Sequence, residues 1–530
     1  MKRTIIITVI MFIALFAFGQ EAEWQWAEQL QGNSGDFVIA KTVDDDGNCF
    51  VTGLYDESIT FGDITLTGGG VFIAEINAAG IWQWAISIDG PVDSPAISID
   101  SYGYIYIAGS FMINIQLGPF SLEGGGLFLA KLNTSGEWQW ARQATVPYIE
   151  CRGISTDSYG NAYVACKFSG TAQFGIFSIT AIDSDDTLVA RYSHDGNCLW
   201  VEQAGPKYPN AIFTDSQGNS YVTGKFFGEA VFGSFTLESW GNCDIFVAKI
   251  GPMGSWLWAK NAGGPSDDGD GIGIGANSDN DIFITGYFED TVAFGEFILT
   301  SYGERDIFVT KMDSQGNWLW AEQAGGSAQD TGKDICIDQY GNSFVTGLFS
   351  STAIFGSNTI SSLGNTDLFV AKIDPLGNWL WVEQAGGQIG SFFEPSITIN
   401  SNGDSYVAGG FSYLVNFGPY PLSSNGDEDF FVAKLSNDVS IENELSQNFN
   451  NLLNYPNPFN PVTNISFDIK ENETGTLSIY NLKGQIVESK EFTSGKHIYP
   501  WNADKRGSGL YIYQLKTDSC VETKKMLLLK

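Results

Sequence analysis

The sequence predicts an all-β protein: a seven-bladed β-propeller closed by its own N-terminal strand, followed by a small Ig-like β-sandwich. Three observations support this prediction. A motif with two aromatic residues, best seen as NWLWVEQAGG at Asn378–Gly387, recurs along the chain. Four short apolar runs fill each interval, and no interval has the 3.6-residue periodicity of a helix. A fixed period of this length indicates an array of one supersecondary unit. The second aromatic residue of the motif lies at Trp26, Trp84, Trp140, Trp200, Trp258, Trp320 and Trp381, in steps of 58, 56, 60, 58, 62 and 61 residues.

Each unit reads as four strands joined by polar turns. In the unit before Asn378, a short run ends at Asp338, a turn follows to Asn342, and a YVTG-like run begins at Phe344. A longer connection containing a Phe-Gly pair leads to an FVAK-like run from Phe369 and then to the WxW run. These β-branched and aromatic runs, bounded by Gly, Asn and Asp, are typical of strands.

The ends of the array predict how it closes. The array begins with a WxW strand, Glu23 to Leu30, that has no FVAK strand before it, and it ends with an FVAK strand, Phe430 to Leu435, that has no WxW strand after it. Pairing these two strands completes a seventh four-stranded blade and removes the exposed sheet edges of an open array. An open β-solenoid, the alternative considered, would need no such exchange.

The two Trp of each WxW strand are two residues apart and therefore point to the same face of the strand. We place this strand outermost in each blade. A ligand-stacking role is the alternative, but a motif repeated seven times, with the full Trp pair in six copies and Cys198 in place of the first Trp in the other, is explained more simply by packing between blades.

The first 19 residues have the pattern of a signal peptide. Lys2 and Arg3 form a basic end, an apolar run follows, and Ala17-Phe18-Gly19 is a small-x-small cleavage site. The run is short for a membrane span, so we expect no membrane-spanning segment in the mature chain.

The chain is strongly acidic, with 27 Lys and Arg against 61 Asp and Glu, a net charge of −34. Setting aside the two basic residues of the signal peptide and the 10 basic and 8 acidic residues of Ser446–Lys530 leaves 15 basic and 53 acidic residues, or −38, for the array. Such a surface excludes nucleic acid as a partner, because phosphate contacts need clustered Lys and Arg. It is consistent with extracellular solubility, or with attraction of cations or basic partners.

The seven Cys are scattered over different positions of different units, which does not form a disulfide framework. Cys151 and Cys166 are the one pair expected on neighbouring strands of a hairpin. The scatter favours free, buried thiols.

The order of motifs, GNxYVTGxF, FGxxxL and DxFVAKxDxxGNWLW, resembles the SBBP-type bacterial β-propeller repeat over Glu23 to Leu435. The first two units depart from it, since Gly70 and Gly126 stand where later units have Asp before the third strand. The resemblance implies a propeller at residues 20–435 in seven repeats of about 59 residues. It implies no single activity.

The C-terminal part has a different composition. An Asn- and Ser-rich linker is expected at 436–453, and strand-like runs fill 454–530. YPNPFNPVTNISFDI, LSIYNLKGQIV, SGLYIYQL and the terminal KKMLLLK closely resemble the type A C-terminal sorting domain of the type IX secretion system. That resemblance implies the secretion machinery as a partner, a Bacteroidetes-like source, and a secreted or outer cell-surface location.

Catalytic residues are not identified. The chain has two His, of which His194 alone lies in the array, in a turn without a nucleophile motif beside it. His-based zinc sites are absent from the sequence. Carboxylates are plentiful, so a glycosidase-type pair stays open as an alternative.

The loops that depart most from the repeat carry the candidate ligand-binding aromatics Tyr148, Tyr208, Phe392 and Phe393. We expect these loops on the face with the longer connections, where a rigid scaffold commonly carries function. The alternative for each aromatic is local packing.

Acidic residues before the innermost strands form an acidic rim that would suit calcium, since its ligands are oxygens. The alternative is turn capping by Asp. The candidates are Asp36, Asp93, Asp268 and Asp330, with Glu150 and Glu394 in corresponding places.

Three functions remain open at this stage. The first is a secreted or surface-held binding or adhesion scaffold for a glycan or protein. The second is an extracellular carbohydrate-active enzyme that uses Asp or Glu, and the third is a purely structural surface component.

Overall fold

A computed structural model describes residues 22–32, 37–182, 185–206, 208–265, 269–387, 391–424, 428–437, 452–455, 459–481, 485–517 and 521–529. The predicted signal peptide, Asp36, Asp268 and most of the predicted linker lie outside these residues. The chain divides into two compact units, Met1–Asn437 and Asp438–Lys530. The described residues of both units form strands, turns and bends, without a helix.

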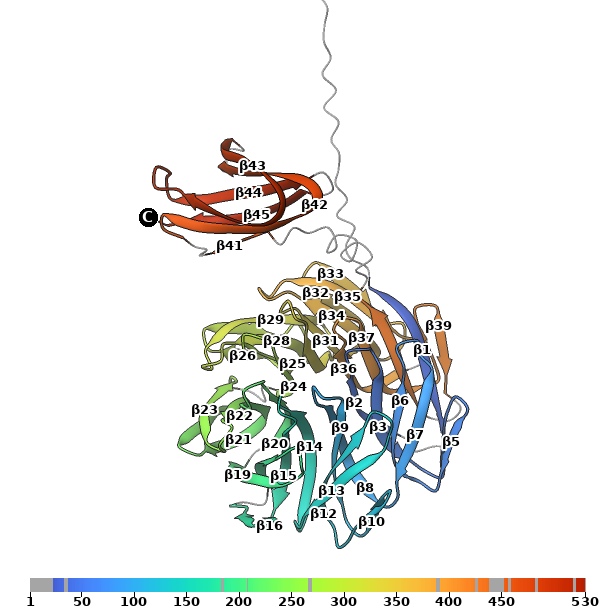
Figure 1. Cartoon of the computed structure of the whole chain (residues 1–530). Coiled ribbons are helices and arrows are strands. Elements are labelled where there is room, and N and C mark those ends of the chain that lie inside the picture. Colours follow the sequence, from blue (N-terminus) through green and yellow to red (C-terminus); the bar gives the residue numbers. More distant parts are fainter. Residues whose placement is uncertain are drawn as a thin grey trace, which may run out of the picture. The chain divides into compact units, whose positions relative to one another are not determined.

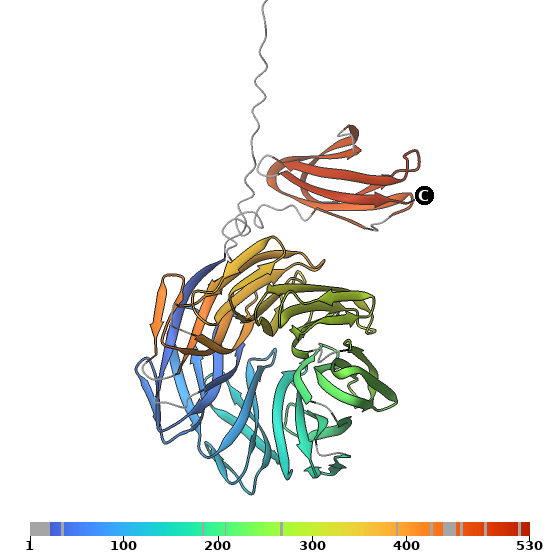
Figure 2. The same ribbon diagram turned by 180° about the vertical axis from the view of Figure 1, so that it is seen from behind.

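The first unit is a β-propeller, with antiparallel sheets arranged around a central axis (Figures 1 and 2). Among the described residues, five sheets have four strands, and two have six strands because a hairpin extends a four-strand set. In chain order the four-strand sets are β2 (Phe37–Val43), β3 (Cys49–Tyr55), β6 (Gly70–Ile76) and β7 (Trp82–Ile88); β8 (Val92–Ile99), β9 (Tyr104–Phe111), β12 (Gly126–Asn133) and β13 (Trp138–Ala144); β14 (Tyr148–Thr156), β15 (Ala162–Ser169), β18 (Asp186–Tyr192) and β19 (Cys198–Pro206); β20 (Tyr208–Thr214), β21 (Ser220–Phe232), β22 (Phe235–Ile250) and β23 (Trp256–Ala262); β24 (Asp270–Ala276), β25 (Ile282–Phe288), β28 (Asp306–Met312) and β29 (Trp318–Gly326); β30 (Thr331–Ile337), β31 (Ser343–Phe349), β34 (Asp367–Ile373) and β35 (Trp379–Ala385); and β36 (Ser391–Ile399), β37 (Ser405–Ser412), β40 (Asp429–Ser436) and β1 (Glu23–Gly32).

The first strand of each set lies next to the axis, and the WxW strand is the last of the set. The inner strands contact one another in the order β2, β8, β14, β20, β24, β30, β36 and back to β2. The last set is completed as predicted, because β1 pairs antiparallel with β40 from Glu23↔Ser436 to Leu30↔Phe430. Trp24 of β1 then packs edge-on against Phe417, with ring centroids 5.0 Å apart.

In six of the seven WxW strands, the second Trp ties its sheet to the next one. Its indole N–H donates to a backbone carbonyl in the turn before the WxW strand of the following sheet, and the glycine of that turn lies against the indole. Gly254, for example, has a φ of +80°, and a Cβ there would lie 3.1 Å from the Trp200 ring. The prediction that these Trp serve packing is confirmed. The indole pairs are Trp26–Ala78 (3.1 Å), Trp84–Thr134 (2.9 Å), Trp140–His194 (3.0 Å), Trp200–Pro252 (3.0 Å), Trp258–Ser314 (3.2 Å) and Trp320–Pro375 (3.0 Å).

The Phe-Gly connections are not open loops as the sequence suggested. In most units they fold into short hairpins, whose Phe packs edge-on against the first Trp of the unit, as Phe355 does on Trp379 at 5.2 Å. The Gly-Gly end of the preceding WxW strand pairs with the hairpin, as in Gly325↔Ile354. Each hairpin therefore bridges two neighbouring sheets. The hairpins are β4 (Ser58–Phe61) with β5 (Ile64–Thr67), β10 (Ile115–Leu117) with β11 (Phe120–Leu122), β16 (Thr171–Phe174) with β17 (Phe177–Thr180), β26 (Thr291–Phe294) with β27 (Phe297–Thr300), β32 (Thr352–Phe355) with β33 (Asn358–Ser361) and β38 (Leu414–Phe417) with β39 (Tyr420–Ser423), and in the β20–β23 sheet β21 and β22 are long enough to include it.

The second unit is an antiparallel five-stranded sheet, in which β43 pairs with β42 beside the order β41-β42-β44-β45. Two of the strand-like runs expected in 454–530, at 464–469 and 475–480, are parts of one strand, β42, whose core face includes Phe467 and Leu477. Trp501 is buried in the same core. The strands are β41 (Leu453–Tyr455), β42 (Val462–Asn481), β43 (Ile486–Asn502), β44 (Gly509–Thr517) and β45 (Val521–Leu528).

We predict that Trp258→Ala destabilises the propeller by about 3–5 kcal/mol, because it removes a buried ring and leaves a cavity between two sheets. Leu257→Ala, on the 45% exposed side of the same strand, is the matched control and should change stability by less than about 0.5 kcal/mol. Denaturant unfolding of both variants measures the difference. Equal losses in the two variants would contradict the role given to the indole.

We also predict that deleting Glu23–Leu30 sharply lowers the melting temperature, because β40 loses its partner strand and the propeller is left with an open edge. Differential scanning calorimetry of the truncated and intact proteins provides the test. An unchanged melting temperature would rule out closure by this strand.

Candidate functional site

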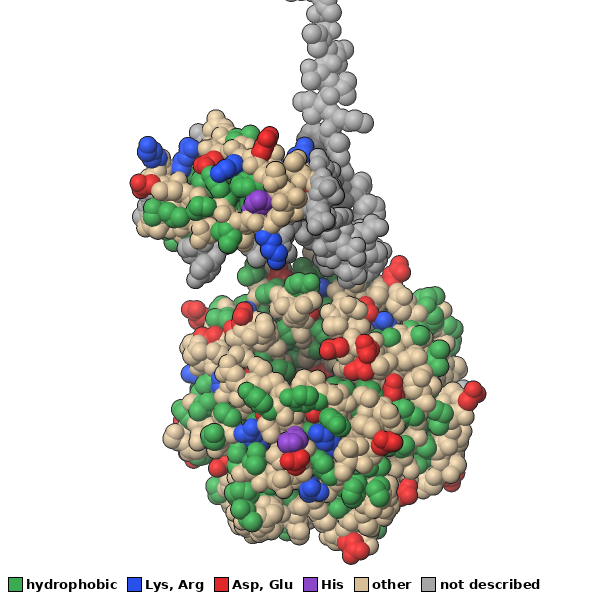
Figure 3. All heavy atoms as spheres, viewed as in Figure 1, with side chains coloured by type: hydrophobic (Ala, Val, Ile, Leu, Met, Phe, Trp, Pro, Cys, Tyr) green, Lys and Arg blue, Asp and Glu red, His purple; other side chains and the backbone are tan. Residues whose placement is uncertain are grey.

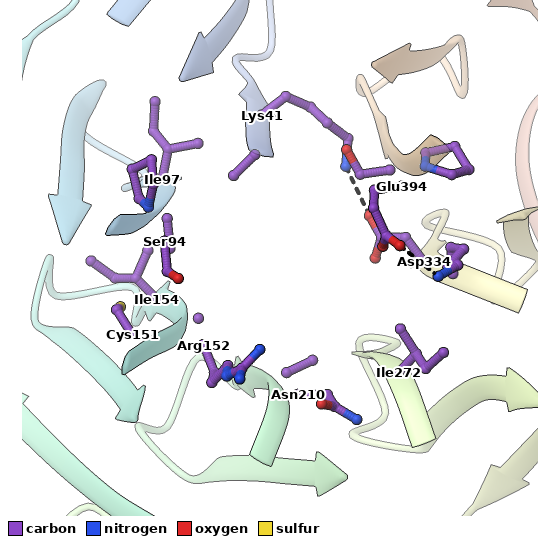
Figure 4. Close-up of a pocket in the computed structure, with 18 of the residues that line it drawn as sticks. Lys41, Ser94, Ile97, Cys151, Arg152, Ile154, Asn210, Ile272, Asp334 and Glu394 are labelled. Carbon is purple, nitrogen blue, oxygen red and sulfur yellow. Dashed lines mark hydrogen bonds and ion pairs between the residues drawn. The ribbon is translucent and has the colours of Figure 1, made fainter. Parts of the chain in front are cut away.

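A cavity of about 590 Å³ lies on the propeller axis and is lined by all of the inner strands β2, β8, β14, β20, β24, β30 and β36. One part of its wall is apolar, with Ile97 and Ile154 (Figure 4). Another part carries Arg152, Asn210 and Glu394. Figure 3 shows a recess at the centre of the propeller face turned to the viewer, and acidic side chains scattered over that face.

Backbone bulges set which side chains reach this cavity. Every inner strand breaks register with its neighbour at the corresponding point, and a bulge re-aims the residue it contains. The bulged positions include Arg152, Asn210 and Lys333, which all line the cavity. Ser94 and Glu394, in the bulges of β8 and β36, have φ values of 50° and 41°. The register shifts are Val38/Ala40, Asp93/Ala96, Cys151/Gly153, Pro209/Ala211, Gly271/Gly273, Gly332/Asp334 and Phe393/Ser396.

Two departures from the repeat compensate each other inside the cavity. Lys41 occupies the position that is Ile in the other units, and Asp334 occupies a position that is Ala, Gly or Ser elsewhere. Their side chains form an ion pair of 2.8 Å, and the Lys41 side chain is only 4% exposed. Asp334 also accepts a hydrogen bond from the backbone N–H of Ile397 at 2.8 Å. A buried Lys needs such a partner, so Lys41 depends on Asp334.

The basic residues of the propeller fall into two classes. The Lys or Arg of the FVAK run is repeated, and most copies pair with an Asp of a short turn, as Lys311 does with Asp281 at 2.8 Å. Six of the basic residues that are not repeated lie instead beside a carboxylate of another kind of position. These pairs are Lys41–Asp334 (2.8 Å), Arg152–Glu150, Lys167–Asp185 (3.2 Å), Lys225–Asp270 (3.0 Å), Arg305–Glu289 (2.7 Å) and Lys333–Glu394 (3.0 Å).

A second cavity, of about 670 Å³, shares Ser94 with the first and contains three of the residues singled out from the sequence, Asp93, Tyr148 and Glu150. Tyr148 is 42% exposed, and its hydroxyl donates to Glu150. This hydrogen bond raises the pKa of Tyr148 to about 12. Glu150 also accepts from Arg152, so one carboxylate orients both side chains.

Lys167 brings Tyr148 and Tyr208 to one site. Its ammonium lies 5.8 Å from the centroid of the Tyr148 ring and 4.8 Å from that of the Tyr208 ring. Both distances are in the range of cation–π attraction. Phe227, which the sequence did not single out, packs edge-on against Tyr208 at 5.8 Å and is 43% exposed. We call Tyr148, Glu150, Arg152, Lys167 and Tyr208 the tyrosine–lysine cluster.

The other two predicted aromatics lie elsewhere. Phe392 is only 2% exposed and packs against Phe417 at 5.6 Å and Phe431 at 5.4 Å, so the expectation that it is exposed was wrong. The alternation of β36 turns it toward the sheet core. Phe393 is half-buried in the same strand.

Asp330 is fully buried, and its two oxygens accept backbone N–H bonds from Gly326 at 2.7 Å and Ser350 at 3.1 Å. That is turn capping. No group of three or more His, Cys, Asp or Glu side chains that would hold a metal occurs among the described residues. Calcium binding therefore stays a prediction without an assembled site, and Asp36 and Asp268 lie outside the described residues.

Cys151 and Cys166 face each other in register between β14 and β15, as expected for one hairpin. Both thiols are free and buried. His194 is 61% exposed beside Asp195, and nothing near it resembles an activated nucleophile in the surrounding turn.

Comparison with known families identifies the C-terminal unit. Residues 454–529 match the model of the secretion system C-terminal sorting domain. The protein is therefore exported through the type IX secretion system to the cell surface or to the outside of the cell. The part of the chain that the structure describes contains no helix long and apolar enough to cross a membrane.

The chain is similar in sequence to an uncharacterised WD repeat-containing protein of Acanthamoeba polyphaga mimivirus, at 24% identity over 64% of this chain. The match spans 31% of that protein's length. Among solved structures, the Dos1 propeller matches with a TM-score of 0.38 at 8% identity, covering 78% of this chain and 95% of its own. A puromycin hydrolase mutant matches with a TM-score of 0.39 at 9% identity, and the match covers 83% of this chain and 60% of the hydrolase chain.

We predict that the propeller loses stability as the pH rises from about 5 to about 8. Burial raises the pKa of Asp330 to about 7 and that of Asp306 to about 6, so the folded state binds more protons than the unfolded state across this window. Ionisation in the folded protein is then the destabilising step.

Thermal melts of Asp330→Asn across the same window should show a shallower decline than wild type. Asp374→Asn, which removes a carboxylate from an exposed turn, is the control for net charge. If the melting temperature of Asp330→Asn falls with pH as steeply as that of wild type, the pH dependence does not come from Asp330 and the prediction is wrong.

Proposed function

We propose that this protein is an exported binding scaffold that holds an uncharged glycan at the long-loop mouth of the central cavity. The tyrosine–lysine cluster carries the proposal, because it places two tyrosine rings and a set of paired charges beside a cavity on the axis. Ring faces can stack on sugars, and paired carboxylate, guanidinium and amide groups supply hydrogen bonds to hydroxyls.

The charge of the site favours an uncharged ligand. Each non-repeated basic side chain of the described site is already beside a carboxylate, so no cluster of free cations is offered to a polyanion. The propeller as a whole carries a large negative charge, which repels acidic polymers at long range. A neutral saccharide needs no free cations for binding and is not repelled by the negative charge of the propeller.

The finer architecture belongs to the same proposal. We infer seven blades, formed by the four-strand sets, in an SBBP-type propeller at residues 20–435, after a signal peptide at 1–19. The cyclic contacts of the inner strands support this count. We also infer a linker at 436–453 and an Ig-like sandwich at 454–530.

One observation favours the alternative function, a carbohydrate hydrolase that uses Asp or Glu, so the experiment below also measures hydrolysis. Asp270 lines the axial cavity together with Asp334, and burial raises the pKa of Asp270. A carboxyl group with a raised pKa near an ionised partner is the arrangement of a glycosidase acid. However, the Asp270 carboxylate forms an ion pair with Lys225 at 3.0 Å and accepts a hydrogen bond from Asn210 at 2.5 Å. These contacts give Asp270 a structural role, which favours binding over hydrolysis.

The test is a glycan array of neutral and acidic saccharides probed with the purified protein, with and without calcium, followed by assay of the hits for released product. We expect saturable binding of a neutral glycan without turnover. Tyr148→Ala should weaken binding about tenfold, whereas Tyr148→Phe, which keeps the ring, should weaken it less.

Tyr159→Ala is the matched control, because Tyr159 is 67% exposed in a short turn away from the cluster. Product release would favour the enzyme. If the protein binds no saccharide on the array and releases no product, the result would favour a purely structural surface component and contradict the proposal.

A further inference from the structure

A second surface is built by loops that hold one large apolar side chain outside each of four consecutive sheets. The loops lie between the Phe-Gly hairpin and the FVAK-like strand. Three of them read Ser-X-Gly, and in each the serine hydroxyl donates to the glycine carbonyl at 3.2 Å. The side chains at the tips are Ile182 (71% exposed), Trp240 (56%), Tyr302 (60%) and Leu363 (56%), which we call the apolar arc.

One buried carboxylate fixes each loop. The Asp that opens the FVAK-like strand accepts a hydrogen bond from the backbone N–H of the tip residue four positions earlier, and all four Asp are fully buried. The hydrogen bond fixes the backbone of the tip residue, whose side chain is exposed. The pairs are Ile182–Asp186 (2.7 Å), Trp240–Asp244 (3.2 Å), Tyr302–Asp306 (2.7 Å) and Leu363–Asp367 (2.8 Å).

The glycine pair after the WxW strand is part of the same device. A Cβ at Gly263 would lie 2.3 Å from Asp244, and one at Gly386 would lie 2.0 Å from Asp367. Only glycine lets the carboxylate approach this closely. The glycine after the WxW strand therefore makes room for the Asp of the neighbouring strand, which in turn holds the loop with the exposed apolar tip.

The arc covers one side of the propeller only. In the first two units Gly70 and Gly126 replace the Asp, and the loops there are glycine runs with no apolar tip. Single exposed apolar residues are ordinary on protein surfaces. Four of them at equivalent positions of consecutive units, each on a loop held by a buried Asp, form a repeated row of apolar tips that can serve for docking.

We propose that the apolar arc docks an extended polypeptide segment that carries apolar side chains interleaved with Lys or Arg. The occupant is extended because the arc offers one contact per sheet in a row. It is a polypeptide rather than a sugar because Ile182 and Leu363 have no flat face for stacking. It is basic because exposed Glu238 and Glu304 lie within two residues of the tips, on a domain of large negative charge.

The experiment measures binding of a short synthetic peptide of alternating Leu and Lys to the purified protein by calorimetry. A peptide with Ser in place of Leu has the same charge and serves as the ligand control. The arc variant is Trp240→Ser with Tyr302→Ser and Leu363→Ser. The matched control variant is Tyr102→Ser with Tyr159→Ser and Tyr340→Ser, three tyrosines that are as exposed on the short turns.

We expect the Leu-Lys peptide to bind wild type and the control variant alike, and to bind the arc variant at least about tenfold more weakly. The Ser-Lys peptide should bind all three weakly. Equal affinity for wild type and the arc variant would overturn the proposal, as would equal affinity for the two peptides, which would assign binding to charge alone.

Static light scattering addresses a different occupant. A dimer of wild type that is lost in the arc variant would assign the arc to a second copy of the chain and overturn the proposal. Because the tips are exposed, all variants should keep the wild-type melting temperature. Trp240→Ser alone should weaken binding in the same direction if the triple variant melts early. A negative result in the peptide experiment does not count against the proposed glycan site, since Tyr148 and Tyr208 are unchanged in the arc variants.

Discussion

The propeller depends on one contact that recurs from sheet to sheet: an indole N–H donating to the carbonyl of a turn in the neighbouring sheet. A sheet of four short strands cannot bury both faces alone, so its stability comes from its neighbours. The indole supplies a large apolar surface and one directional bond at the same place. The turn must then lie against the ring, which only glycine permits, as Gly254 does over Trp200. Thus the DxxGN turn and the WxW strand are two halves of one joint.

Residues that follow the repeat and residues that depart from it have different uses. The repeated Trp, Gly, Asp and FVAK Lys assemble the scaffold, and the second indole of the WxW strand and the turn Asp are hydrogen-bonded within it. Lys41, Asp334, Arg152 and Tyr148 break the repeat, and all of them line a cavity on or beside the axis. Since a uniform scaffold needs none of them for assembly, they are the positions at which a ligand can be selected. Export to the cell surface places that site where extracellular ligands are met.

Much of the fold was predictable because strand alternation and turn chemistry are local. The WxW packing, the four runs per unit and the pairing of β1 with β40 all follow from spacing alone. The candidate site was harder to predict from the sequence than the fold. Tyr148 and Tyr208 were found as loop aromatics, but Lys167 between them looked like an ordinary strand residue. Phe392 was misassigned because the bulge before Ser396 shifts which residues of β36 face the core. Aligning the units position by position would have revealed Lys41 and Asp334, whereas their pairing requires the closed ring.

Hydrogen exchange of the indole N–H groups tests the joint most directly. In a ¹⁵N-labelled sample, the indoles of Trp26, Trp84, Trp140, Trp200, Trp258 and Trp320 are predicted to exchange only through global unfolding, because each is bonded to the next sheet. Their exchange should therefore slow together and respond alike to denaturant. If these indole protons exchange within seconds under native conditions, the sheets are not held by this contact and the account is wrong.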